Sequence, residues 1–393
     1  MTRRVLFHCQ HSLGLGHLVR SLALAGCLAE HFDVTLLNGG RLPAGTIVPP
    51  GVELVDLPSL GHDAGHRLVS QEPGRSVDDV CAARRALVLD AFEQIRPDVV
   101  VVELYPFGRR KFEFELLPLL EAATARADRP LVVSSVRDIL VGRDDGGRHD
   151  ERARQRADRY LDAVLVHSDP RFARFEESFR PSTPLAVPVH HTGFVVPSRS
   201  PSGTTPTAPR GWMLPRVLVS VGGGMVGDDL LSTAAAAAPV VRARTGLTTT
   251  LVAGPFLPDL ARRRLHELVV TEPALTVLDR VDDLCAEIGR SAASVSQAGY
   301  NTTMDVLRAG RPAIVVPYAA AGEDEQTRRA GRLQELGIVR VIAERELTPQ
   351  RFAEEVTGLP RSVPQAARLD LGGGPRSAGL VARLVDDRRS VPA

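Results

Sequence analysis

The stretch Val217-Leu-Val-Ser-Val-Gly-Gly-Gly-Met225 joins an apolar run to three consecutive glycines, and a long helical pattern follows it. A short run rich in valine and leucine is typical of a strand buried on both faces of a parallel sheet. Glycines between such a strand and a helix allow a tight turn and leave backbone amides to bind an anion. No lysine follows, so this is not the P-loop of nucleotide triphosphatases. The stretch predicts a strand–turn–helix unit with a candidate phosphate-binding loop.

Similar apolar runs alternate with helical patterns along the rest of the chain. The other predicted strands are Val5–Cys9, Val34–Asn38, Val99–Glu103, Leu131–Ser135, Ala163–His167, Thr249–Ala253, Leu275–Leu278, Ala293–Ser296 and Ala313–Pro317. Strands that alternate with helices form a parallel sheet covered by helices on both faces. The sequence therefore predicts the α/β class, with doubly wound, Rossmann-like sheets.

A segment rich in proline, serine, threonine and glycine, residues 197–214, divides the pattern into two halves. At 393 residues the chain is long enough for two domains. We expect one domain over residues 1–196, a linker over 197–214, a second domain over 215–374 and a last helical segment over 375–393. The carboxyl ends of the strands in both domains are expected to face a central cleft.

The composition excludes several classes of protein. The formal net charge is +1, from 48 basic and 47 acidic side chains, so the chain is not built to neutralise nucleic acid. The four cysteines lie far apart, without the spacing of a metal site or a disulfide framework. No apolar stretch reaches the length of a membrane span, and polar residues interrupt the apolar start of the chain too early for a signal peptide. We predict a cytoplasmic protein without a cofactor, a metal or a nucleic-acid partner.

The first half carries its own glycine-rich motif, His11-Ser-Leu-Gly-Leu-Gly-His-Leu-Val-Arg20, directly after the first strand. Gly14 and Gly16 permit a tight turn, and His17 falls at a helix start, where backbone amides favour an anion. The spacing is not GxGxxG and no acidic residue closes the second strand, so a nicotinamide dinucleotide site is not indicated. Two interpretations remain open, a functional histidine and a plain glycine-rich turn with a solvated one.

Two further motifs follow neighbouring strands of the second half. In Ser296-Gln-Ala-Gly-Tyr-Asn-Thr-Thr-Met-Asp305, Gly299 opens a helix whose first turns carry Thr302 and Asp305. Hydroxyls and amides there can bind phosphate and Asp305 can accept from sugar hydroxyls, although acidic residues near a helix start also complement the helix dipole. Glu325 and Gln326 begin a helix after the next strand, where capping alone would explain them. Three candidate loops at one sheet edge favour a single site.

Taken together, these motifs resemble the donor domain of GT-B glycosyltransferases of family 28. The resemblance is carried, in order, by Gly222–Gly224, Asp279–Leu284, Ser296–Asp305, Ala309–Pro317 and Glu325–Ala330. The Gly14–His17 loop is similar to the glycine-rich loop of the family's first domain, and neighbouring runs resemble an uncharacterised bacterial branch of predicted glycosyltransferases. The resemblance implies a GT-B fold whose C-terminal helix crosses back onto the first domain.

The resemblance also implies a donor site in the second half. The Val281 backbone would contact the nucleotide base, and Asp305, where the family usually has glutamate, would hold the ribose. Glu325 and Gln326 stand where two polar residues bind the donor sugar. The residues implied to line the diphosphate are Gly222, Gly223, Gly224, Met225, Ser296, Gln297, Ala298 and Gly299.

The function implied is an inverting, metal-independent transfer from a nucleotide-diphosphate sugar, with UDP favoured, to a small-molecule or lipid-linked acceptor. His17 is the candidate general base, since a pKa near neutrality suits that task. Glu103 and Asp138 end nearby strands and are candidates to orient His17 or bind acceptor, although Asp138 could instead pair with Arg137. The basic cluster Arg109–Lys111 could contact anionic lipid, but one short cluster is more often a solvated surface.

Three alternatives keep the same donor site. Gly14–Arg20 matches a G-x-G-H-x-x-R turn of related sugar-nucleotide hydrolases, in which water is the acceptor. A 2-epimerase of the same fold is a further alternative. A non-catalytic sugar-nucleotide-binding partner would keep the motifs of the second half and lose the base of the first.

Overall fold

The computed structural model describes residues 2–11, 16–42, 45–63, 67–142, 145, 147–197, 214–223, 226–319, 324–359 and 369–390. The chain divides into two compact units. The first comprises Met1–Ser198 with Asp370–Ala393, and the second comprises Arg199–Leu369. The predicted linker, residues 197–214, lies almost wholly outside the described residues. No described helix is long and apolar enough to cross a membrane.

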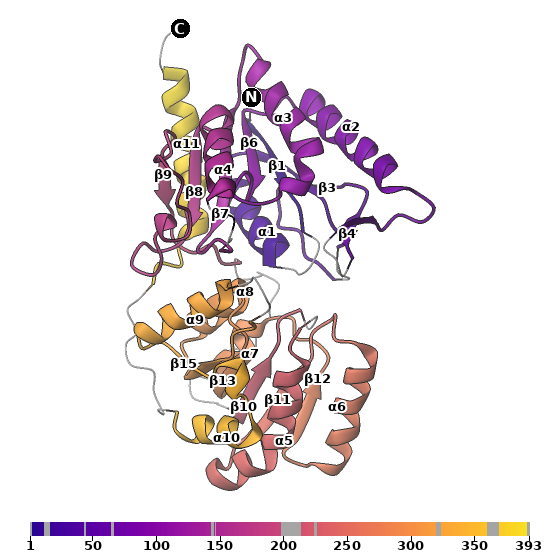
Figure 1. Ribbon diagram of the computed structural model, residues 1–393, viewed down its shortest axis with the longest axis vertical. Helices are drawn as coiled ribbons and strands as arrows, with labels where there is room; N and C mark the ends of the chain where they lie inside the picture. The colour runs from indigo at the N-terminus through magenta and orange to yellow at the C-terminus, as the bar shows by residue number, and fades with distance from the viewer. Residues whose placement is uncertain are drawn as a thin grey trace. The chain divides into compact units, whose positions relative to one another are not determined.

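The first unit is built on a parallel seven-stranded sheet in the order β3-β2-β1-β6-β7-β8-β9 (Figure 1). Its strands are β1 (Arg4–Cys9), β2 (Asp33–Asn38), β3 (Val52–Asp56), β6 (Val99–Glu103), β7 (Leu131–Arg137), β8 (Ala163–His167) and β9 (Val189–His191). A small antiparallel pair, β4 (Leu60–His62) and β5 (Leu68–Ser70), lies in the chain between β3 and the second helix. The helices are α1 (Gly16–Leu28), α2 (Val77–Ile95), α3 (Glu113–Ala125), α4 (Arg148–Tyr160) and α11 (Gly373–Ser390), with 3-10 turns Arg110–Phe112 and Phe175–Glu177.

Alternation along the central strands explains why this sheet is covered on both faces. Leu6 and Val100 pack with α2, α3 and α4 in one core, whereas Phe7 and Val101 pack with α1 and α11 in another. Successive side chains of a strand point to opposite faces, so an uninterrupted apolar run serves both cores.

The second unit repeats the architecture with a parallel six-stranded sheet in the order β12-β11-β10-β13-β14-β15. Its strands are β10 (Leu214–Ser220), β11 (Thr248–Val252), β12 (Leu275–Leu278), β13 (Ser291–Ser296), β14 (Ala313–Val315) and β15 (Arg340–Val341). Its helices are α5 (Asp228–Thr245), α6 (Asp259–Thr271), α7 (Leu284–Arg290), α8 (Tyr300–Ala309), α9 (Glu325–Glu335) and α10 (Pro349–Thr357), with a 3-10 turn at Glu344–Glu346. Helices α5, α6 and α10 cover one face of this sheet. The predicted fold class, two doubly wound Rossmann-like sheets, is confirmed.

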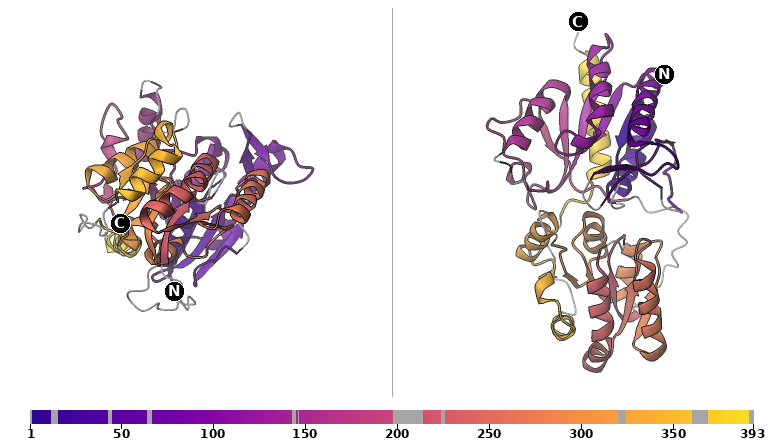
Figure 2. Two further views of the ribbon diagram at one scale, coloured as in Figure 1. Left: turned by 90° about the horizontal axis from the view of Figure 1, so that it is seen from below. Right: turned by 45° about the vertical axis from the view of Figure 1, so that its right-hand side comes forward.

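Helix α11 is the last described element and belongs to the first unit (Figure 2). It starts at Gly373, two residues before the helical segment 375–393 that the sequence predicts. A Cβ on Gly373 would lie 2.0 Å from the carbonyl oxygen of Gly193, so only glycine allows this approach of two backbones. Val381 and Val385 are buried in the core that α1 shares with the sheet.

Candidate functional site

His17 lies near the start of α1, at the edge of the sheet where the parallel strands end. Its Nδ1 is 2.6 Å from Oε1 of Glu103, the last residue of β6. Strand β6 is the direct neighbour of β1, whose end leads into α1, and this adjacency brings the two side chains together. Gly16 is the first residue of α1, and Gly14 lies outside the described residues.

Glu103 is buried and is held by three basic side chains. Arg20 donates to Oε1, and Arg109 donates from Nε and Nη2 to Oε2 at 3.1 Å each. Burial alone would raise the pKa of Glu103, but His17, Arg109 and Arg20 outweigh it and hold the pKa well below its ordinary value. An ionised Glu103 can only accept, so Nδ1 of His17 carries the proton and Nε2 keeps its lone pair.

The pKa of His17 differs from the near-neutral value expected from the sequence. Burial, reinforced by the positive charge of Arg109, lowers its pKa to about 3, although Glu103 acts in the opposite direction. The imidazole is therefore neutral throughout the physiological range of pH. Neutral imidazole with a fixed tautomer is the form that can accept a proton.

The segment after β6 has an unusual backbone. Leu104 and Arg109 both adopt positive φ, 63° and 62°, a conformation that costs free energy in residues other than glycine. This backbone conformation brings the side chain of Arg109 back into contact with Glu103. Arg109 therefore differs from the exposed Arg110 and Lys111, with which the sequence grouped it as a basic cluster. Neither Arg20 nor Arg109 was assigned to this site from the sequence, and the only signal was Arg20, the arginine that closes the glycine-rich motif.

The second predicted carboxylate, Asp138, is buried just beyond the end of β7. Ser135 of β7 pairs with Glu103, so Asp138 lies three residues past that level. The carboxylate that the structure places against His17 Nδ1 is Glu103.

In the second unit, three predicted loops gather at one sheet edge. Ser220 of β10 pairs with Ser296 of β13, which in turn pairs with Val315 of β14. The glycine-rich turn lies close to the start of α8. A Cβ added to Gly222 would be only 3.5 Å from Oγ1 of Thr302. Gly222 itself has φ of 58°, which favours glycine.

The other residues of the implied diphosphate site are only partly described. Gly223 accepts a backbone hydrogen bond from Phe256, whereas Gly224 and Met225 lie outside the described residues. Ser296 is buried, and its hydroxyl has no hydrogen-bond partner among the described residues. Gly299 is the N-cap residue of α8.

Glu325 and Gln326 have contacts that the sequence did not indicate. Oε1 of Gln326 accepts from the backbone amides of Ala298 at 3.1 Å and Tyr318 at 3.2 Å. Glu325 accepts from Arg329 at 2.6 Å, and Arg329 also donates to the carbonyl of Ala298 at 2.8 Å. The start of α9 thereby holds the loops after β13 and β14 in place.

Asp305 lies on α8, which packs against α7. Burial raises its pKa to about 7; Arg308 lowers it and Asp283 raises it further. Asp283 caps α7 through the Ala286 amide, and the partly buried Val281 precedes it in the same loop. The implied ribose and base residues therefore lie on adjoining elements.

The two sheets and their helices have the fold of GT-B glycosyltransferases. A glycosyltransferase from the kitacinnamycin system superposes with a TM-score of 0.61 at 19% identity, covering 99% of each chain. The calicheamicin glycosyltransferase CalG4 gives 0.60 at 20% identity, covering 99% of this chain and 98% of that one. MurG of Acinetobacter baumannii gives 0.56 at 18% identity, covering 99% and 100%.

Within that class, residues 218–368 match the glycosyltransferase family 28 C-terminal domain. Two curated relatives are similar to part of this chain. The UDP-N-acetylglucosamine–N-acetylmuramyl-(pentapeptide) pyrophosphoryl-undecaprenol N-acetylglucosamine transferase of Syntrophotalea carbinolica is 31% identical over 122 residues, 31% of this chain and 34% of that protein. The enzyme of the same name from Rhizobium johnstonii is 32% identical over 108 residues, 26% and 29%. The match thus spans about a third of these relatives' length.

Proposed function

We propose that the protein is an inverting glycosyltransferase that moves a sugar from a nucleotide-diphosphate donor, with UDP favoured, to a small-molecule or lipid-linked acceptor. The contact between His17 Nδ1 and Glu103 is the observation that carries this proposal, because it makes Nε2 of a neutral imidazole a proton acceptor. The family 28 domain in the second unit supports a nucleotide-sugar donor.

In the proposed reaction, Nε2 of His17 accepts the proton of the acceptor hydroxyl. The acceptor oxygen forms a bond to the anomeric carbon, while the bond from that carbon to the diphosphate breaks and its electron pair leaves with the diphosphate. A single displacement inverts the anomeric configuration. The imidazolium that forms lies against the Glu103 carboxylate, which stabilises the developing charge.

Glu103 is a positioning residue in this scheme rather than the base. Its two oxygens already accept hydrogen bonds from His17, Arg20 and Arg109. Its charge fixes the tautomer of His17.

Backbone amides are the groups that we assign to the departing diphosphate. The turn at Gly222 and Gly223 and the start of α8 lie together at one edge of the sheet. Amides at a helix start and in a glycine turn stabilise phosphate oxygens without needing a bound metal. No cluster of three metal-binding side chains occurs among the described residues.

A His17→Ala variant tests the role of the base. We expect kcat for UDP release to fall by about 10²–10⁴-fold, while the dissociation constant of UDP changes little, because the donor contacts belong to the other unit. The acid limb of the parent kcat profile is expected well below pH 6, since the pKa of His17 is lowered to about 3. His31→Ala, at an exposed histidine, is the matched control.

The products distinguish the candidate acceptors. Mass spectrometry after incubation with UDP-sugars identifies a glycoside for a transferase and free sugar for a hydrolase. Near-normal turnover in the His17→Ala variant, or a parent protein that does not bind UDP, would overturn the proposal.

A further inference from the structure

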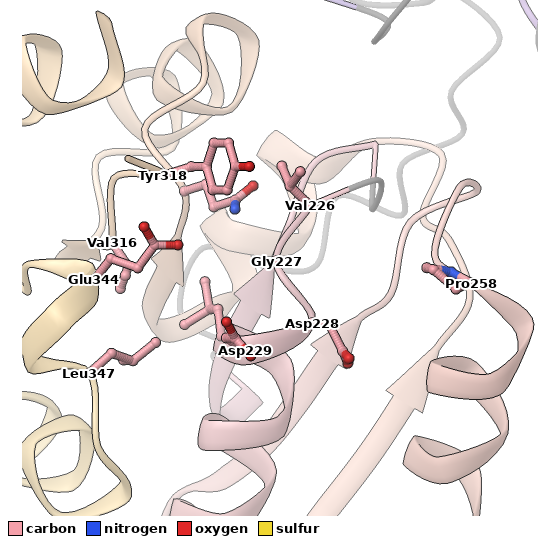
Figure 3. Close-up of a pocket in the computed structure, with 11 residues that line it drawn as sticks. Val226, Gly227, Asp228, Asp229, Pro258, Val316, Tyr318, Glu344 and Leu347 are labelled. Carbon is pink, nitrogen blue, oxygen red and sulfur yellow. The ribbon is translucent and has the colours of Figure 1, made fainter. Parts of the chain in front are cut away.

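A pocket of about 190 Å³ lies in the second unit, between the start of α5, the end of β14 and the 3-10 turn at Glu344 (Figure 3). Sites for whole drug-sized ligands usually exceed 300 Å³, so this volume suits one ring of a larger molecule. Of the residues that line it, Gln297 alone was assigned to the donor site from the sequence.

Gln297 provides the pocket with an amide that can bind a ligand. The residue is buried, with 8% of its surface exposed, and its side chain makes no hydrogen bond to any described residue. The backbone beside it is fixed, because Ala298 is bound through its amide by Gln326 and through its carbonyl by Arg329. An amide that is held in place on the pocket lining, without a described partner, is an available donor and acceptor for a group that enters the pocket.

Gly227 permits this arrangement. It has φ of 120°, and a Cβ there would lie 2.6 Å from Val221 Cγ1 and 3.1 Å from Nε2 of Gln297. Glycine therefore keeps the wall beside the Gln297 amide open.

The charged side chains of the pocket are all acidic. Asp228, Asp229 and Glu344 line it, and the described residues of the lining include no lysine, arginine or histidine. One oxygen of Glu344 accepts from the backbone amide of Ala319 at 3.0 Å, which fixes this carboxylate at the pocket. Such a lining repels phosphate and favours a cation.

The remaining wall is aromatic and apolar. Tyr318 and Leu347 share the side of the pocket that carries Glu344, and Asp229 lies on the other (Figure 3). An aromatic face suits the C–H face of a sugar ring and also attracts an ammonium group.

We propose that this pocket binds the amine-bearing ring of an amino-sugar donor, with Asp229 and Glu344 on the ammonium group and Gln297 on a ring hydroxyl. The proposal rests on the glycosyltransferase function above and adds the class of sugar. Gln297 connects the two, because it lies both in the pocket and in the loop assigned to the diphosphate.

Calorimetric titration of the full chain with UDP, UDP-glucose and UDP-glucosamine near pH 6.5 tests it. The two sugar nucleotides differ only in one hydroxyl against one ammonium group. We expect UDP-glucosamine to bind about tenfold more tightly than UDP-glucose, with a preference that shrinks as salt is added. The Asp229→Asn/Glu344→Gln double variant should lose the preference and keep its affinity for UDP. Gln297→Ala should weaken both sugar nucleotides.

Asp78→Asn, which removes an exposed first-turn carboxylate in the other unit, is the matched control and should keep the preference. Equal affinities for the two sugar nucleotides, or a preference that survives in the double variant, would overturn the assignment of the pocket. Failure of UDP itself to bind would count against the proposed function, and free glucosamine against free glucose would then test the pocket alone.

Discussion

At the scale of single residues, the Glu103 carboxylate has two roles. It orients His17, and it balances the buried charge of Arg20. Glu103→Gln keeps the size of the side chain and removes its charge. Breaking a buried ion pair by removing one partner typically costs about 3–5 kcal/mol, so the variant should lose that much free energy of unfolding in urea. Its kcat should also fall, because His17 loses the carboxylate that fixes its tautomer. Asp128→Asn, at an exposed carboxylate paired with Arg126, should change neither measurement, and an equal loss there would contradict the argument.

Asp305 should make stability depend on pH. Its pKa is about 7 in the folded protein against an ordinary 3.8, so the folded state keeps a proton that the unfolded chain releases. The stability that this proton provides is present below about pH 4 and is lost as pH rises towards 7. Urea titrations should therefore show Asp305→Asn gaining stability over the parent at pH 8 and less at pH 5.

Nucleotide binding provides the second measurement on Asp305. If its carboxylate accepts from ribose hydroxyls, Asp305→Asn should bind UDP more weakly, and the parent should bind UDP more tightly at pH 8 than at pH 6. Asp259→Asn, at an exposed helix start, should leave both unchanged. A parent and an Asp305→Asn variant with the same pH dependence would contradict the raised pKa.

At the scale of elements, Arg84 of α2 connects several parts of the first unit. It donates to Glu115 of α3 at 2.6 and 2.8 Å, to Gln10 after β1 at 2.7 Å, and to the carbonyls of Gly39 and Pro58 after β2 and β3 at 2.8 and 2.9 Å. Arg84→Met should lower the free energy of unfolding by about 3–5 kcal/mol, because Glu115 is left buried and charged. The Arg84→Met/Glu115→Leu double variant should recover part of that loss. A single variant as stable as the parent in urea would show that the contacts are dispensable.

Sequence patterns predicted the central strands well but missed the edge strands β3, β9 and β15, whereas the edge strand β12 coincides with the predicted Leu275–Leu278. The predictions for Val99–Glu103 and Ala163–His167 coincide with β6 and β8. These strands carry a full run of buried, mostly apolar residues. Strand β3 was not predicted, because an edge strand needs only half-buried, mixed side chains, as in Val52-Glu-Leu-Val-Asp56. The same reason applies to β9.

The candidate site shows the same division. The glycine motifs, His17, Glu103 and Asp305 were predicted because special backbone geometry and strand ends have local signatures. The choice between Glu103 and Asp138 depends on strand order, and β6 lies next to β1 whereas β7 lies one strand further away. That order involves contacts distant in sequence, as do Arg109 on Glu103 and the pocket around Gln297. No local pattern encodes them.

At the scale of the whole molecule, α11 should contribute to the first unit alone. Val381 is buried against the core of α1 and the sheet, so Val381→Asp places an unpaired charge there. We expect calorimetry to show the first unit destabilised by more than about 3 kcal/mol. UDP should still raise the melting temperature of the second unit. Arg383→Asp, on the exposed side of the same helix, should have little effect, and a loss of UDP stabilisation in Val381→Asp would contradict the division into units.

The return of α11 to the first unit has a consequence for how the protein is made. On the ribosome, a chain emerges from its N-terminus and its domains generally fold as units in that order. Here the first unit lacks one of its own helices until residues 370–390 have been translated, which is after every residue of the second unit. The apolar face that α11 later covers stays open throughout that interval, so the half of the molecule that is translated first is the last to be completed.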